Sequence, residues 1–233
     1  MTSRKDHAVS RRLRHLLAIV IVGGLVSSCG YVVTVSSVED EVVVKLAAGA
    51  TPSYDHPLRV SSHDLAAVLQ AVQVKFKTNW LQRLLSGPLN SLPLFDESSL
   101  NRVAPLLAEA LERAGPRERV VFYVAQRKSD VRRDVTSGTI FVKGRLLYLT
   151  VTNYQNRVDV LPGVPAYDRQ NPEVAIAPQR MTLVFDRPEF LTDREPDLVD
   201  GVFGAAPPRL MIDYALFLKT SAHDGAVSRS NTK

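Results

Sequence analysis

The segment that most constrains the fold is TSGTIFVKGRLLYLTVT, residues 136–152. It combines β-branched and aromatic residues, which suit the pleated, half-buried surface of a sheet. Gly144 follows Lys143 near its centre, and a glycine in a short connection lets two strands turn back on each other. The segment therefore predicts a hairpin of two antiparallel strands, at 136–143 and 145–152.

Other stretches of the chain carry the same kind of strand signal. Val72, Val74 and Phe76 alternate with polar residues, which predicts a strand that is buried on one face. Residues 120–124 are almost continuously apolar, as expected for a central strand. The remaining predicted strands are 31–35, 42–46, 182–185 and 210–218.

One long helix and one shorter helix are predicted between these strands. Residues 96–115 place their apolar side chains on one helical stripe, with acidic residues at the start and a glycine at the end. Pro105 either kinks this helix or lies in the first turn of a shorter helix that begins near Ala104. Ser61, with Asp64 three residues later, resembles a capping box that opens a short amphipathic helix.

Strands before, between and after helices favour an α+β fold, with a mainly antiparallel β-sheet and two or three helices packed on one face. We expect one such domain at 29–218 and a flexible C-terminal tail at 219–233. Two proline-bearing segments, 154–179 and 187–208, are predicted to be loops that bind something, cover something or lack order. Trp80 and the leucines after it predict a further helical turn, which belongs to the core or, alternatively, to a surface that contacts the membrane or a partner.

Residues 1–28 have the layout of a signal peptide, in which a basic stretch precedes an apolar stretch at Leu16–Val26. The apolar stretch is shorter than the about 20 residues that a membrane-spanning helix needs. Residues 1–28 contain five of the chain's 29 basic residues and one of its 24 acidic residues. The rest of the chain therefore has a formal charge of +1 instead of +5, which removes the main argument for a nucleic-acid partner.

The sequence Val26-Ser27-Ser28-Cys29 resembles the lipobox of bacterial lipoproteins, and the resemblance covers residues 1–29 only. It implies cleavage between Ser28 and Cys29, followed by a diacylglyceryl group on the Cys29 sulfur, which is the chain's one thiol. A glycine directly after the cysteine, here Gly30, resembles the sequence of lipoproteins that are anchored in the outer membrane and face the periplasm. Anchoring in the inner membrane is the alternative. The other interpretations are an ordinary signal-peptide cleavage site and an incidental free cysteine.

The chain shows none of the common catalytic or cofactor motifs. It lacks HExxH, paired cysteines, GxSxG and glycine-rich phosphate loops, so we expect no metal, no cofactor and no enzymatic activity. His63-Asp64 lies at a predicted helix start and is interpreted as a capping pair; catalysis would require these side chains to converge with a serine or tyrosine in a cleft. The acidic residues between Asp186 and Asp200 are interpreted as a solvated loop, with opportunistic calcium binding as the alternative.

Four basic residues gather between two predicted strands, in the sequence QRKSDVRRD at 126–134. Guanidinium groups are suited to two-pronged contacts with phosphate or carboxylate groups, so this turn is a candidate contact for anions or for an acidic partner. Asp130 and Asp134 could instead neutralise the turn locally. The candidate contact residues are Arg127, Lys128, Arg132 and Arg133.

These observations favour a lipid-anchored envelope protein that acts as a non-catalytic binding or assembly accessory of a membrane-associated complex. Its expected contacts are the membrane, through Cys29, and an envelope protein. The alternative is a periplasm-facing carrier that encloses a lipid or another apolar ligand between sheet and helices. A carrier predicts a large apolar cavity lined by residues such as Val74, Phe76, Leu107, Phe122 and Leu149.

Overall fold

The computed structural model of the chain describes residues 32–36, 40–49, 53–77, 91–160, 167–192 and 207–221. The predicted signal peptide, Cys29, the turn at Trp80 and nearly all of the predicted tail lie outside these residues. No helix among the described residues is long and apolar enough to cross a membrane.

The larger sheet has six strands in the order β1-β2-β5-β6-β7-β9, and every neighbouring pair is antiparallel. The structure therefore confirms the predicted fold class, a mixed α+β fold with antiparallel sheets. The strands are β1 (Val32–Ser36), β2 (Asp40–Ala48), β5 (Glu118–Ser129), β6 (Arg132–Lys143), β7 (Leu146–Asp159) and β9 (Arg209–Asp213).

The predicted hairpin is confirmed as β6 and β7, which pair from Lys143 and Leu146 outwards. Gly144 has a φ of +60° at the first turn position, which a glycine adopts without strain. The strands are longer than predicted, because β7 continues to Asp159 through six residues of the predicted loop 154–179. That prediction was wrong at its start, because residues 156–159 pair with 132–135 of β6 although Tyr154 and Val158 are the only apolar residues in 154–159. A stretch with so few apolar residues gives no strand signal in the sequence.

A second antiparallel sheet has the order β4-β3-β8. It contains β3 (Val72–Phe76), whose bounds match the prediction, and β8 (Met181–Phe185), which was predicted from 182 onwards. The third strand is the two-residue β4 (Leu92–Pro93).

The two predicted helices are α2 (Ser62–Gln70) and α4 (Glu97–Arg113). The Ser61 side chain accepts a hydrogen bond from the Asp64 backbone N–H, and the Asp96 side chain caps α4 in the same way. Pro105 lies within α4 on an exposed position, and the helix runs through it to Arg113. The alternative of a shorter helix that begins near Ala104 is therefore not adopted.

The predicted strand at 210–218 is wrong after residue 213, where the chain turns into a helix at 214–221. Asp213 is the physical reason, because its carboxylate accepts a hydrogen bond from the Leu216 backbone N–H and so caps the helix. The predicted loops contain two further short elements, the single-turn helix α5 (Tyr167–Gln170) and a 3-10 turn at Pro188–Phe190.

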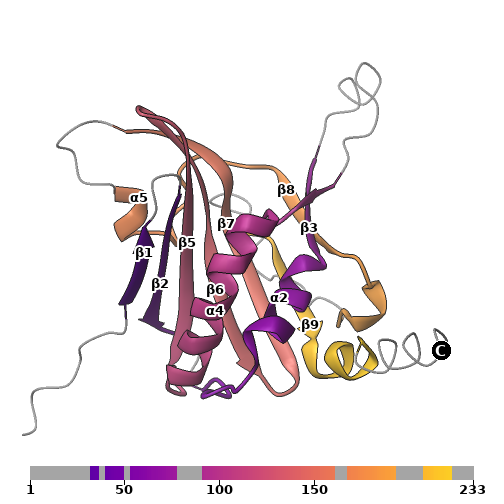
Figure 1. Cartoon of the computed structure of the whole chain (residues 1–233). Coiled ribbons are helices and arrows are strands. Elements are labelled where there is room, and N and C mark those ends of the chain that lie inside the picture. Colours follow the sequence, from indigo (N-terminus) through magenta and orange to yellow (C-terminus); the bar gives the residue numbers. More distant parts are fainter. Residues whose placement is uncertain are drawn as a thin grey trace, which may run out of the picture. The chain divides into compact units, whose positions relative to one another are not determined.

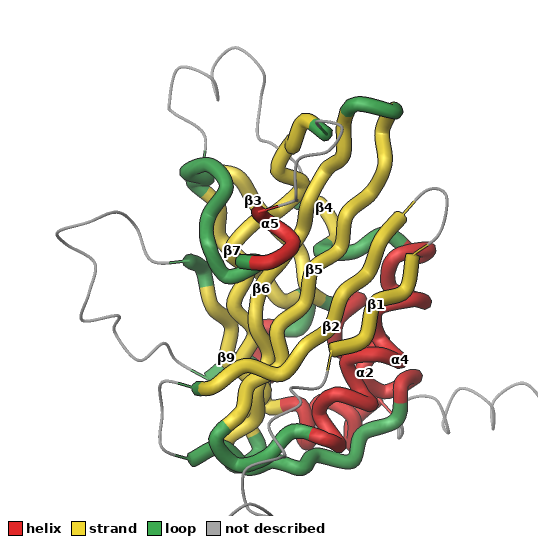
Figure 2. Tube along the Cα trace, turned by 90° about the vertical axis from the view of Figure 1, so that its left-hand side faces the viewer, coloured by secondary structure: helices red, strands yellow, loops and turns green. Residues whose placement is uncertain are grey.

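The larger sheet is covered on both faces (Figures 1 and 2). Helices α2 and α4 pack on one face, where they share one apolar core with both sheets. α5 and residues 171–180 lie on the opposite face, above a small cluster of Val43, Tyr123, Ala125 and Val135. Residues 167–180 are called the covering segment below.

Candidate functional site

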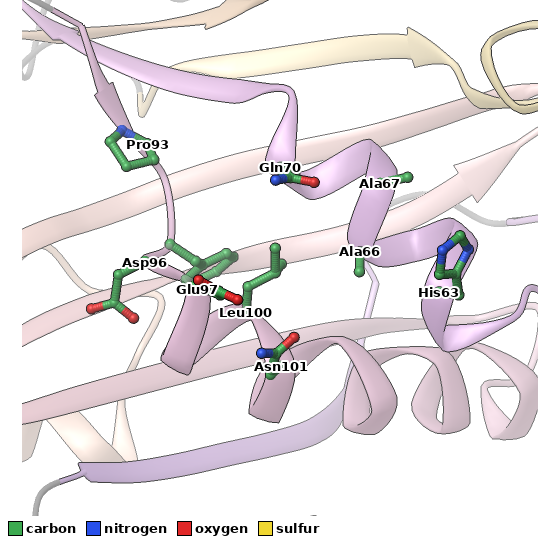
Figure 3. A pocket seen from close by; sticks show the side chains of 10 residues that line it. His63, Ala66, Ala67, Gln70, Pro93, Asp96, Glu97, Leu100 and Asn101 are labelled. Carbon is green, nitrogen blue, oxygen red and sulfur yellow. The ribbon is translucent and has the colours of Figure 1, made fainter. Parts of the chain in front are cut away.

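An open groove lies between α2 and the first turns of α4, and it has a volume of about 420 Å³ (Figure 3). This volume falls within the range of about 300–1,000 Å³ that is typical of ligand pockets. Its lining consists of His63, Ala66, Ala67, Gln70, Pro93, Phe95, Asp96, Glu97, Leu100 and Asn101.

The middle of the groove is apolar and firmly supported. Ala66 and Ala67 line it from α2 and Leu100 lines it from α4 (Figure 3). Phe95 is buried beneath them and meets Phe122 of β5 edge to face, with ring centroids 5.7 Å apart. The floor of the groove is therefore continuous with the main core.

One end of the groove is acidic. Asp96 and Glu97 lie there beside Pro93, whereas His63 lies at the other end (Figure 3). Partial burial by itself would raise the pKa of Asp96, but hydrogen bonds from Ser99, Ser98 and Gln126 outweigh burial and lower this pKa below its usual value. Asp96 is therefore an anion at neutral pH.

Asp64 takes part in capping, as the capping interpretation predicts, and His63 lies beside it on the surface. The His63 side chain is 95% exposed and lies 3.9 Å from the Asp64 carboxylate. Asp64 itself accepts a hydrogen bond from the Ser61 hydroxyl at 2.8 Å, which completes the cap of α2. The described residues contain no group of three or more His, Cys, Asp or Glu side chains that could hold a metal ion.

The predicted basic contact residues lie around the turn between β5 and β6, and each has a polar partner. Arg127 pairs with Asp130 at 2.6 Å, and Arg132 lies 3.7 Å from Asp134. The Lys128 ammonium donates to the Gln126 side chain at 3.1 Å.

Arg133 differs from these three because it points beneath the covering segment. It forms an ion pair with Asp168 at 2.8 Å, and the two side chains are only 16% and 10% exposed. The local neutralisation considered from the sequence therefore occurs at the turn, and contact of the turn with an anion or an acidic partner stays a prediction.

A buried polar cluster that the sequence did not predict joins the covering segment to the sheet. The Tyr123 hydroxyl donates to Asp168 at 2.7 Å, on the same carboxylate that Arg133 holds. Burial, together with the hydrogen bond and charge of Asp168, raises the pKa of Tyr123 far above its usual value. No local motif marks Asp168, since its partners lie 45 and 35 residues away in the sequence.

Hydrogen bonds of the Asn153 and Gln179 amide side chains join β7 to the next part of the covering segment. The Asn153 side chain donates to the Val174 carbonyl and accepts from the Ile176 backbone N–H, at 2.9 and 2.8 Å. The Gln179 side chain bonds both the N–H and the carbonyl of Tyr154. All four of these partners are backbone groups, so the arrangement fixes the path of the segment and offers no reactive group.

The residues named for the carrier interpretation form part of the main core. Val74, Leu107, Phe122 and Leu149 have no exposed surface, and Phe76 packs partly buried against the same cluster. None of these five residues lines the groove between α2 and α4. The carrier alternative stays a prediction.

Comparison with known proteins gives no relative for this chain. No protein-family model, no curated protein and no solved structure matches it significantly.

Proposed function

We propose that this chain is a lipid-anchored envelope protein that binds a protein partner of a membrane-associated complex and catalyses no reaction. The carrying observation is the open groove between α2 and α4, which joins an apolar middle to polar ends. Protein interfaces commonly have this arrangement, because the buried centre excludes water while the rim keeps polar contacts. Partner binding is thus the use that the groove supports best.

The membrane anchor in this proposal rests on the lipobox-like sequence that ends at Cys29. Two or three acyl chains give stable attachment, whereas one chain binds only marginally. The first described strand begins at Val32, so two residues of the chain separate it from Cys29. We assign the protein to the periplasmic side of the outer membrane, with the inner membrane as the alternative.

Metabolic labelling with a fatty-acid analogue tests the anchor. We expect label on the wild-type chain and none on the Cys29→Ala variant, because the variant lacks the sulfur that forms the thioether. Equal labelling of both chains would overturn the anchor.

Crosslinked recovery from membranes tests the groove. We expect a discrete set of envelope proteins with the wild-type chain and loss of that set with Ala67→Arg, because a long charged side chain fills the groove. Ala215→Arg is the matched control, since Ala215 is an exposed helical alanine away from the groove. An identical set with both variants, or recovery of lipid without protein, would contradict partner binding at this groove; the second result would favour the carrier.

A further inference from the structure

The charges of the groove restrict the chemistry of what it binds. Among the residues that the structure describes, its lining contains two carboxylates, Asp96 and Glu97, and no lysine or arginine. Hydrogen bonds keep Asp96 ionised, as described above, so this end of the groove is negative at neutral pH. A bound group that carries a positive charge is attracted there, and a negatively charged group is repelled.

The shape of the groove restricts the size of what it binds. Ala66 and Ala67 have short side chains, and Leu100 is almost fully buried beside them, so the space between the helices lies open above an apolar floor. Figure 3 shows this apolar stretch beside the end that carries Asp96 and Glu97. An apolar side chain therefore fits next to a cationic one whose aliphatic stem continues along the floor.

We propose that the groove recognises a segment of a protein partner that inserts one apolar side chain between α2 and α4 and places a lysine or arginine beside it. The cation lies against Asp96 and Glu97. This inference rests on the proposed function and adds the chemistry of the partner to it.

The competing occupants carry a negative charge or show a dependence on protein concentration that a basic segment does not. A fatty acid or a phospholipid brings a carboxylate or phosphate, which Asp96 and Glu97 repel. A second copy of this chain would perturb the groove as the protein concentration rises, with no added probe. Both occupants are therefore separable from a basic protein segment in one experiment.

The test uses the full chain in a neutral detergent, with carbon-13 in its alanine methyl groups so that Ala66 and Ala67 report on the groove by NMR. The probes are the acetylated and amidated dipeptides Leu-Lys, Leu-Glu and Gly-Lys, and decanoate. We expect saturable shifts of these two methyl signals with Leu-Lys, and binding of Leu-Glu that is weaker by about two- to fivefold, as for one exposed ion pair. Gly-Lys, which lacks the apolar side chain, should also bind more weakly.

Charge reversal sharpens the test. Glu97→Lys should remove or invert the preference for Leu-Lys, whereas Glu112→Lys, an exposed change near the other end of α4, should preserve it. Folding of each variant is checked by the methyl signals of buried Ala104 and Ala125.

Three outcomes would overturn the inference: equal affinity for Leu-Lys and Leu-Glu or no saturable shift, tighter binding of decanoate, or shifts that depend on chain concentration alone. The dipeptide titration is independent of lipidation and of the crosslinked set. Failure of the anchor, or the lack of a discrete set of crosslinked proteins with the wild-type chain, therefore refutes the proposed function. Equal dipeptide affinities overturn this inference and leave the proposed function standing.

Discussion

The two faces of the larger sheet are covered by different chemistry. On one face, α2 and α4 bury a continuous apolar cluster that includes Phe122, Ile140 and Leu149. On the other face, the covering segment is held mainly by polar contacts, such as those of Asp168 with Tyr123 and Arg133. Apolar burial depends on area and has little directional preference, whereas hydrogen bonds require donors and acceptors in defined positions. The first face should therefore dominate stability, and the second should fix the path of one segment.

The largest expected effect is on the helix-covered face. Phe122→Ala should lower the free energy of unfolding by about 3–5 kcal/mol, because it removes a fully buried ring and leaves a cavity under Phe95. Chemical denaturation of the variant and the wild-type chain measures the difference. A loss no larger than that of a polar substitution on the other face would contradict the assignment of the dominant core.

Asp168→Ala tests the polar contacts on the face under the covering segment, called the polar face below. It leaves Arg133 and the Tyr123 hydroxyl without their shared carboxylate. We expect a loss of about 2–3 kcal/mol, the range for removing one partner of a buried charged pair that retains some solvent contact. Asp168→Asn is the matched control, since its amide oxygen still accepts from Tyr123, and its loss should be smaller.

Hydrogen exchange tells whether this loss is confined to one face. Exchange at the Val174 and Ile176 amides should accelerate in Asp168→Ala, while the amides of α4 keep their wild-type rates. Equal acceleration of both regions would show that the two faces open together.

Alkaline pH should weaken the polar face through Tyr123. Its pKa is raised in the folded protein, so above about pH 10, the ordinary pKa of tyrosine, the unfolded chain binds fewer protons than the folded chain and stability falls as pH rises. Tyr123→Phe should flatten this fall in denaturation curves measured between neutral and alkaline pH. Tyr154→Phe should flatten it less, because burial raises the pKa of Tyr154 only to about 12.

The smallest expected effect lies at the exposed turn between β5 and β6. Arg127→Ala should change stability by less than about 0.5 kcal/mol, since exposed ion pairs contribute little. Asp130, the partner of Arg127, has a side chain that is 94% exposed. A thermal unfolding midpoint that falls as far as that of Asp168→Ala would mean that the turn is part of the polar network.

The candidate groove shows which features local sequence patterns predict and which they do not. The sequence predicted the Ser61 cap of α2, the acidic start of α4 and its apolar stripe, so both helices that form the groove were expected. The capping role of Asp96 became visible only in the structure. Their separation was not readable, because it depends on how Ala66, Ala67 and Leu100 pack over Phe95. The predicted strand at 210–218 failed for a related reason, since its apolar residues fit a strand and a helix equally well until Asp213 caps the latter.

The sequence alone determined the α+β fold class, the β6–β7 hairpin, β3 and the presence of the helix α4, because these depend mostly on patterns within one helix or one strand. The tertiary structure decided that α4 runs through Pro105. The tertiary structure decided that the predicted loop 154–179 extends β7 and then covers the second sheet face, and that Arg133 faces inward while Arg127 stays at the turn. Those outcomes depend on contacts such as Tyr123 with Asp168, which are distant in the sequence. Such contacts have no local signature, since a hydrogen bond exists only after the fold has placed both partners within reach.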